Sequence, residues 1–378
     1  MNELNKAYPL DEQAQQSLPS GGGLLTELSK KGYNYLKEGV LSEAESAFQD
    51  LIEIDLGNSY GLAGLGDVAR RRGKHKLAIE FYQKCLALFP DNNAALLGLA
   101  DCYKATNQVA KALLIWEDHL KVHDKNIAVL TRMADVYRKM RNFKKSKEAY
   151  LRVLAVEGDN AYALTGLGYL HYDFKDFREA LVYWEKVYGA NSSGADVRIL
   201  TNLGNCHRKL KTYALGLPYF HQALALDQRN FYALFGAADC YRGMNQMEQS
   251  LEYWNYILEQ DPVNKVILTR VGDALRQLGR LDEAKEKYQA ALKVEFDVYA
   301  VLGLAIVHKE QGQYQEAIDS LSDILANDPN NPRIYSEIAE CQQQSGDRDA
   351  ARATLKLFYR RGLKNQQISA MLNQLDDD

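Results

Sequence analysis

The sequence predicts an all-α fold, a right-handed superhelical α-solenoid of helix-turn-helix repeats with a C-terminal capping helix. Three observations predict it. Glycines recur with a period of about 34 residues. Each period carries one large apolar residue and one small residue at fixed positions, and most place glycine or asparagine between two stretches of helical pattern. Such hairpins bury their apolar faces only by stacking on their neighbours.

The period is set by Gly66, Gly168, Gly204 and Gly272, which stand in near-identical local sequences. With Leu25 as position 1, ten repeats follow one another across residues 25–363. They begin near residues 25, 59, 93, 127, 161, 197, 231, 265, 298 and 332. Each repeat therefore has room for two helices and a short turn.

Three positions define the predicted hairpin core. Position 24 is a large apolar residue in every repeat, and it accounts for all three tryptophans: Phe48, Tyr82, Trp116, Tyr150, Trp184, Phe220, Trp254, Tyr288, Leu321 and Leu355. Position 20 is small: Ala44, Ala78, Ala112, Ser146, Ala180, Gly216, Ser250, Ala284, Ala317 and Ala351. Position 15 favours the turn residues Gly39, Gly73, Asn107, Asn245, Gly279, Gly312 and Gly346. We expect position 20 to allow close approach of two helices around a buried position 24.

This glycine-turned hairpin resembles the tetratricopeptide repeat family, whose Leu-Gly-x-x-Tyr, Ala-x-x-x-Phe and late-proline pattern recurs across residues 25–363. The resemblance implies a superhelix with a concave groove lined by the first helices, and a role in binding proteins. Two departures predict a bend or flexibility. Two extra residues enter near Asn191–Gly194, and the boundary at Phe296 and Asp297 is one residue short.

The two ends differ from the repeats. Residues 1–23 contain Pro9, Pro19 and three consecutive glycines, which predicts a disordered N-terminal tail. Residues 364–378 combine a predicted capping helix with an acidic C-terminus. The apolar face of that helix consists of Ile368, Met371, Leu372 and Leu375.

Composition favours a protein that recognises its partner locally. The net charge of −4 provides no field that would attract nucleic acid or an anionic membrane. The polar start and the absence of a long apolar run predict no secretory signal and no membrane helix, so we expect a cytoplasmic location.

Four cysteines occupy position 10 and one position 27, where the family places alanine: Cys102, Cys206, Cys240, Cys341 and Cys85. We expect them reduced and buried, with no metal or cofactor.

Catalysis is not predicted. His171, His207 and His308 stand at position 11, where other repeats have tyrosine, and we expect them to replace a core aromatic residue. The sequence has no phosphate-binding glycine loop, nucleophile elbow or metal-binding histidine pair. We therefore expect a scaffold or adaptor and not an enzyme.

Two polar rows follow the first helices. Position 9 reads Asp67, Asp101, Asp135, Tyr169, Asn205, Asp239 and Asp273 in repeats two to eight. Position 12 reads Arg70, Lys104, Arg138, Tyr172, Arg208, Arg242 and Arg276. Two interpretations remain open. Each acid pairs with the base three residues later on its own helix, or the rows present donors and acceptors to a bound peptide.

Positions 2, 6, 9 and 13 are predicted to point away from the core and, in the family, into the groove. The candidate partner-binding residues are Arg132, Asp135, Arg138, Tyr162, Tyr169, Tyr172, Arg198, Asn202, Asn205, Arg208, Tyr232, Asp239, Arg242, Arg270, Asp273 and Arg276. The fifth repeat and its flanks form the predicted hot spot. We expect the position-6 glycines to leave room for a partner backbone: Gly64, Gly98, Gly166, Gly236 and Gly303.

The third and seventh repeats match beyond the family pattern, as do the fourth and eighth, which indicates a duplicated four-repeat block with two related surfaces. Chance drift on a shared template is the alternative.

Three classes of partner are compatible with the sequence, and a protein or peptide is preferred. Nucleic-acid binding is supported by basic clusters at residues 70–76 and 138–147, but the position-9 aspartates would repel phosphates. The array could also regulate an enzyme on another chain. Capture of chaperone C-termini is not expected. Only Asn205 and Arg270 match the family's carboxylate clamp, while Thr201, Gly236 and Val266 replace its other three residues.

Overall fold

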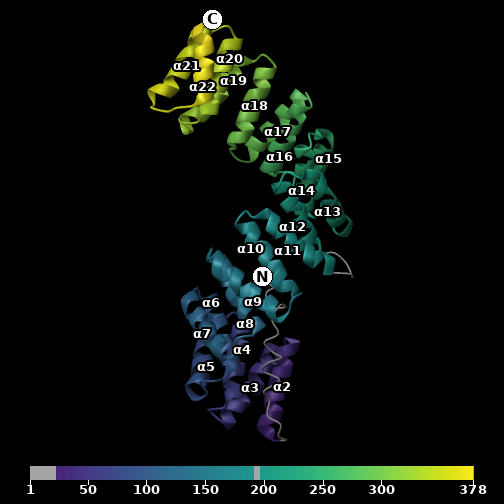
Figure 1. Ribbon diagram of the computed structural model, residues 1–378, viewed down its shortest axis with the longest axis vertical. Coiled ribbons are helices and arrows are strands. Elements are labelled where there is room, and N and C mark those ends of the chain that lie inside the picture. Colours follow the sequence, from purple (N-terminus) through teal and green to yellow (C-terminus); the bar gives the residue numbers. More distant parts are fainter. Residues whose placement is uncertain (1–22, 191–195, 378) are drawn as a thin grey trace. The chain divides into compact units, whose positions relative to one another are not determined.

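The computed structural model describes residues 23–190 and 196–377, and this part of the chain is entirely helical (Figure 1). The helices are α2 (Leu24–Glu38), α3 (Leu41–Ile54), α4 (Ser59–Arg71), α5 (His75–Leu88), α6 (Asn93–Ala105), α7 (Val109–Val122), α8 (Ile127–Lys139), α9 (Phe143–Val156), α10 (Ala161–Asp173), α11 (Phe177–Ala190), α12 (Val197–Lys209), α13 (Tyr213–Leu226), α14 (Phe231–Gly243), α15 (Met247–Gln260), α16 (Lys265–Gln277), α17 (Leu281–Val294), α18 (Val298–Glu310), α19 (Tyr314–Asn327), α20 (Pro332–Gln344), α21 (Arg348–Arg360) and α22 (Gln366–Asp377). The all-α prediction is confirmed.

Even-numbered helices up to α20 are the first helices of the repeats, and odd-numbered helices up to α21 are the second. Asparagine caps most of the first helices. The side-chain oxygen of Asn230, for example, accepts a hydrogen bond of 3.1 Å from the backbone N–H of Ala233. This contact satisfies a backbone donor that the first turn of a helix leaves without a partner.

The turn inside each hairpin ends in a left-handed residue at position 15. Gly279 has φ +74° and Asn245 has φ +60°. Arg141, Lys175 and Lys211 adopt the same conformation without being glycine or asparagine. The turn geometry therefore persists where the sequence signal for it is missing, at a conformational cost of about 1 kcal/mol per residue.

The ring at position 24 packs between two first helices. Phe220 has no exposed surface, and it lies against Gly204 of its own repeat and Gly236 of the next. An added Cβ would come within 2.7 Å of the ring at Gly204 and 2.2 Å at Gly236. Position-6 glycines thus make room for a ring of the same chain, so the expectation that they make room for a partner backbone is wrong.

The described chain divides into two compact units within the fifth repeat. The N-unit ends at Asp176 and contains α2 to α10, and the C-unit starts at Phe177 and contains α11 to α22. The two helices of the fifth repeat therefore belong to different units. Most of the predicted insertion near Asn191, like residues 1–22 of the predicted tail, lies outside the described residues.

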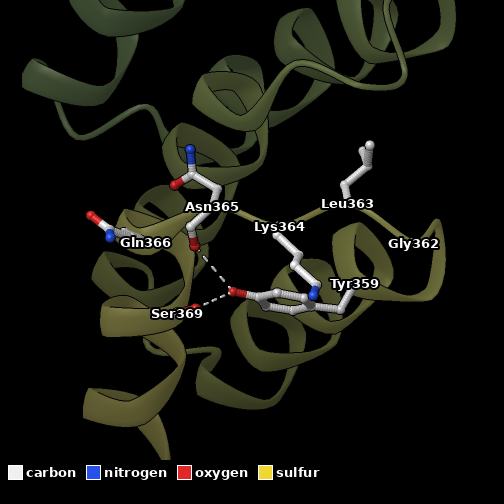
Figure 2. A pocket seen from close by; sticks show the side chains of 7 residues that line it. All are labelled: Tyr359, Gly362, Leu363, Lys364, Asn365, Gln366 and Ser369. Atoms are coloured by element: carbon white, nitrogen blue, oxygen red, sulfur yellow. Dashed lines mark hydrogen bonds between the residues drawn. The ribbon is translucent and has the colours of Figure 1, made fainter.

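Helix α22 covers the last hairpin, as predicted. Ile368 and Leu375 are buried in a cluster with Leu355 and Phe358 of α21. The turn before α22 is fixed by Tyr359, whose hydroxyl donates to the carbonyl of Asn365 at 3.2 Å and lies 2.5 Å from Ser369 Oγ (Figure 2). The apolar edge of the array is thereby shielded from water.

Candidate protein-interaction surface

The aspartates of position 9 are held by buried tyrosines wherever position 24 is tyrosine. Asp67 accepts a hydrogen bond of 2.7 Å from Tyr82 Oη, and Asp273 accepts one of 2.8 Å from Tyr288 Oη. Burial and the neighbouring Asp273 both raise the pKa of Tyr288, so its hydroxyl remains a donor. Much of the acidic row therefore supports the fold.

Asp135 shows the same arrangement with two donors. Its carboxylate accepts a hydrogen bond of 2.5 Å from Tyr150 Oη and a second from the hydroxyl of Tyr162 in the next repeat. Sequence reasoning missed this role. The signal was present, because Asp at position 9 and Tyr at position 24 coincide in repeats two, four and eight.

In repeats three and seven, where position 24 is tryptophan, arginine replaces the tyrosine hydroxyl as the aspartate's partner. Arg132 Nε lies 3.0 Å from Asp101 Oδ1, and its side chain is only 2% exposed. Arg132 was predicted to point away from the core, and this is wrong. Its guanidinium is used within the chain, because it forms this ion pair and donates a hydrogen bond of 2.9 Å to the carbonyl of Ala128.

Asp239 in the C-unit binds two arginines. Arg208 Nη1 and Arg242 Nη2 each lie 2.7 Å from its carboxylate, which is 11% exposed. Burial alone would raise the pKa of Asp239, but the hydrogen bonds and charges of the two arginines outweigh it and lower the pKa. Asn205 accepts a further hydrogen bond of 3.1 Å from Arg208.

The basic row is tied to carboxylates both within and between repeats. Arg70 binds Asp67 on its own helix at 2.9 Å, as the pairing interpretation predicted. Arg138 instead reaches Asp173 of the next repeat at 2.6 Å, and Arg276 reaches Glu310 at 3.0 Å. The rows therefore join neighbouring repeats, which a pattern read along a single helix did not predict.

The predicted hot spot is divided between the two units. Tyr162, Tyr169 and Tyr172 belong to α10 of the N-unit and are half-buried, and the Arg138 guanidinium lies 5.5 Å from the ring centre of Tyr169. Arg198, Asn202, Asn205 and Arg208 belong to α12 of the C-unit. Arg198 is largely exposed and pairs at 2.9 Å with Asp196, the residue that caps its own helix.

The most exposed aromatic side chains of the described first helices lie in the C-unit, and of these only Tyr232 is among the predicted partner contacts. Tyr232 is 69% exposed and Tyr299 is 73% exposed, both at position 2 of their first helices, α14 and α18. Val266 occupies the same position of α16 and is 50% exposed. Arg270, one turn further along α16, is half-buried and has no hydrogen bond or ion pair with the described residues. These four residues form what we term the C-unit row.

Comparison with known proteins places these features in a family. Two sequence profiles described as tetratricopeptide repeat match the chain, one at residues 69–125 and 308–375, the other at 29–92, 131–196, 237–298 and 269–332. The chain belongs to the tetratricopeptide repeat family. No curated protein sequence is significantly similar to it.

Solved tetratricopeptide structures resemble parts of the chain at low identity. MamA shares 19% identity over 46% of this chain and 93% of its own, with a TM-score of 0.43. YrrB, described as having an unusual peptide-binding site, shares 19% over 49% and 95%, with a TM-score of 0.44. The pilus biogenesis factor PilW shares 20% over 54% and 94%, with a TM-score of 0.47.

Tetratricopeptide repeat proteins are generally scaffolds that bind other proteins. Within the described ranges, no group of His, Cys, Asp and Glu is arranged to hold a metal ion, and no helix is long and apolar enough to cross a membrane. The five cysteines are buried. His171 is 2% exposed and packs edge-on against Phe143 at 5.1 Å, as expected of a core aromatic residue.

Proposed function

We propose that this chain is a non-catalytic scaffold that binds an extended or helical segment of another protein across the C-unit row. The observation that carries the proposal is the exposure of a large apolar side chain at position 2 of three successive first helices, Tyr232, Val266 and Tyr299. Aromatic side chains of this kind are enriched among the residues that dominate binding energy.

Arg270 supplies the polar contact of the proposed row. It lies four residues after Val266 on α16, so both side chains stand on one face of the helix. Its counterpart Arg132 engages Asp101, whereas Asp239, the residue equivalent to Asp101, is already bound by Arg208 and Arg242. Arg270 is therefore available to a carboxylate or carbonyl of the partner.

The acidic row of position 9 and the basic row of position 12 support the scaffold by stabilising it, and not by contacting a bound peptide. Contacts such as Arg138 with Asp173 and Arg276 with Glu310 link adjacent first helices, so they hold the spacing of the surface side chains. A preorganised surface loses less conformational entropy when a partner binds. These residues are thus proposed to act as supports, with the exposed row making the contacts.

Nucleic-acid binding is less well supported than protein binding. In the basic cluster at residues 70–76, Arg70 pairs with Asp67 at 2.9 Å and Arg72 with Glu45 at 2.6 Å. Arg71 donates to the carbonyl of Leu36. Three of the positive charges in this cluster are therefore used inside the chain.

A cytoplasmic location remains our proposal, supported by the five buried, unpaired cysteines.

The test begins with affinity purification and mass spectrometry to identify the partner, followed by binding measurements on Tyr232→Ala/Tyr299→Ala. Aromatic anchors commonly contribute about 2 kcal/mol or more each, so the double variant should lose about 4 kcal/mol, which is about a thousandfold in affinity. The matched control is Tyr256→Ala, an exposed tyrosine on the second helix α15. Unchanged affinity of the row variant, with a loss in the control, would refute the proposal.

A further inference from the structure

Lys104 differs from the other cations of the basic row. The remaining cations at position 12 each contact a carboxylate: Arg70, Arg138, Arg208, Arg242, Arg276 and Lys309. Lys104, at position 12 of α6, has no hydrogen bond or ion pair with any described residue. It belongs to the N-unit, whereas the C-unit row belongs to the C-unit.

The neighbouring residues explain why Lys104 has no carboxylate. Arg138 and Arg276 each reach an acid at position 13 of the following repeat, Asp173 and Glu310. For Lys104 the equivalent residue is Lys139, which is another cation.

The two nearby acids are already engaged. Asp101 lies against Arg132 at 3.0 Å, and Asp135 accepts the hydroxyls of Tyr150 and Tyr162. Neither carboxylate therefore forms an ion pair with Lys104.

The local electrostatics agree with this geometry. Lys104 is half-buried, and the loss of water lowers its pKa. The carboxylates of Asp101 and Asp135 favour the protonated amine, whereas the charges of Arg132 and Lys139 oppose it. An added negative charge would favour the protonated amine, because opposite charges stabilise each other most where solvent is partly excluded.

We propose that the N-unit binds an anionic side chain of a protein partner, a carboxylate or a phosphate group, between Lys104 and Lys139. The geometry favours a peptide over a nucleic acid, because Asp101 and Asp135 flank the position and would repel a continuous row of phosphates. This inference shares with the proposed function only the premise that the faces of the first helices bind protein segments. It concerns a second surface, which selects acidic sequences.

The test is selection of a random dodecapeptide phage library on the full chain, followed by affinity measurement with synthetic peptides. Selected peptides that bind the N-unit should carry Asp or Glu. The Lys104→Gln variant should bind these peptides with about tenfold lower affinity. Exchanging the peptide acid for its amide should weaken binding to the wild-type chain equally, and should have little further effect on Lys104→Gln. That coupling identifies the contact. A phosphoserine version of the peptide distinguishes phosphate from carboxylate.

The control is Lys144→Gln, an exposed lysine on the second helix α9. NMR of the ¹³C-dimethylated chain adds a direct measurement, because bound acidic peptide should raise the pKa of Lys104.

Peptides that depend on Tyr232 and Tyr299 but tolerate Lys104→Gln would overturn this inference and leave the proposed function standing. Failure to select any peptide would overturn both. Lys104-dependent binding of a single-stranded oligonucleotide, with no such peptide, would replace the peptide by nucleic acid and overturn the inference as stated.

Discussion

Gly236→Ala is predicted to destabilise the C-unit although it places a better helix former inside α14. The new Cβ would lie 2.2 Å from the ring atoms Cε1 and Cζ of Phe220, far inside van der Waals contact. Phe220 is fully buried and has Gly204 on its other side, so the ring has nowhere to move. Overpacking of this kind destabilises the fold by about 1–3 kcal/mol. The higher helix propensity of alanine stabilises it by somewhat less than about 1 kcal/mol. The net loss should be up to about 2 kcal/mol.

The matched control is Gly189→Ala in α11, another helical glycine of the C-unit. An added Cβ there meets nothing within 4 Å, so the substitution should stabilise by up to about 1 kcal/mol. Urea unfolding of both variants, followed by circular dichroism, gives the two shifts. In a Phe220→Ala background Gly236→Ala should cease to destabilise. If both glycine variants stabilise the intact chain, the packing argument is wrong.

Four further predictions follow from the contacts. Asp273→Ala removes the acceptor of the Tyr288 hydroxyl and should cost about 1–2 kcal/mol in urea unfolding; a loss below about 0.5 kcal/mol would show that the hydrogen bond contributes little. Burial raises the pKa of Cys102, Cys206 and Cys240 to about 12 and of Cys85 and Cys341 to about 11, so at about pH 8 all five thiols should react with Ellman's reagent far more slowly than in urea; one fast native thiol would contradict this. Arg208→Ala/Arg242→Ala leaves buried Asp239 without a counterion. Because burial alone raises the pKa of Asp239, the stability loss should grow as pH rises from about 4 to about 7. A stability loss that is additive and independent of pH would refute this prediction. Trp254→Ala should cost about 3–5 kcal/mol and raise hydrogen exchange mainly in α14 to α17, whereas uniform loss of protection across the C-unit would contradict nearest-neighbour stacking.

The fold was predictable because its signals repeat. The large residue at position 24 and the small residue at position 20 are buried in repeat after repeat; Trp254 and Ala284, for example, have no exposed surface. The turn was predictable wherever glycine or asparagine marks it. It was not marked at Arg141, Lys175 or Lys211, where packing of the flanking helices imposes a left-handed conformation that these residues rarely adopt alone.

The site was harder to predict, because surface and core residues exchange roles between repeats. Tyr162 is one of the predicted partner contacts, yet its hydroxyl donates a hydrogen bond to Asp135 of the preceding repeat. Arg208 is another of the predicted partner contacts. Arg208, however, neutralises an almost buried carboxylate, so reversing its charge should destabilise the C-unit as well. Periodicity along one helix cannot show contacts made across repeats.

One relation between repeats connects the core to the surface. Position 6 is glycine after a repeat whose position 24 is Phe or Tyr, because an added Cβ would strike that ring, as at Gly98 against Tyr82. After Trp116, Trp184 and Trp254 it is Arg132, Asn202 and Arg270. A polar side chain therefore appears at position 6 of these first helices where the preceding core ring is an indole.

The two halves of the predicted duplication differ in how they use this arrangement. Behind Trp116, Arg132 is buried against Asp101, whereas behind Trp254, Arg270 keeps its guanidinium available because Asp239 already binds two other arginines. The two related surfaces expected from the duplication are therefore chemically different. Arg270 could be replaced without any change in the core. Replacing Trp254 by tyrosine, in contrast, would favour glycine at position 270, because glycine follows every repeat whose position 24 is tyrosine. The core aromatic residues and the proposed partner specificity are thus coupled.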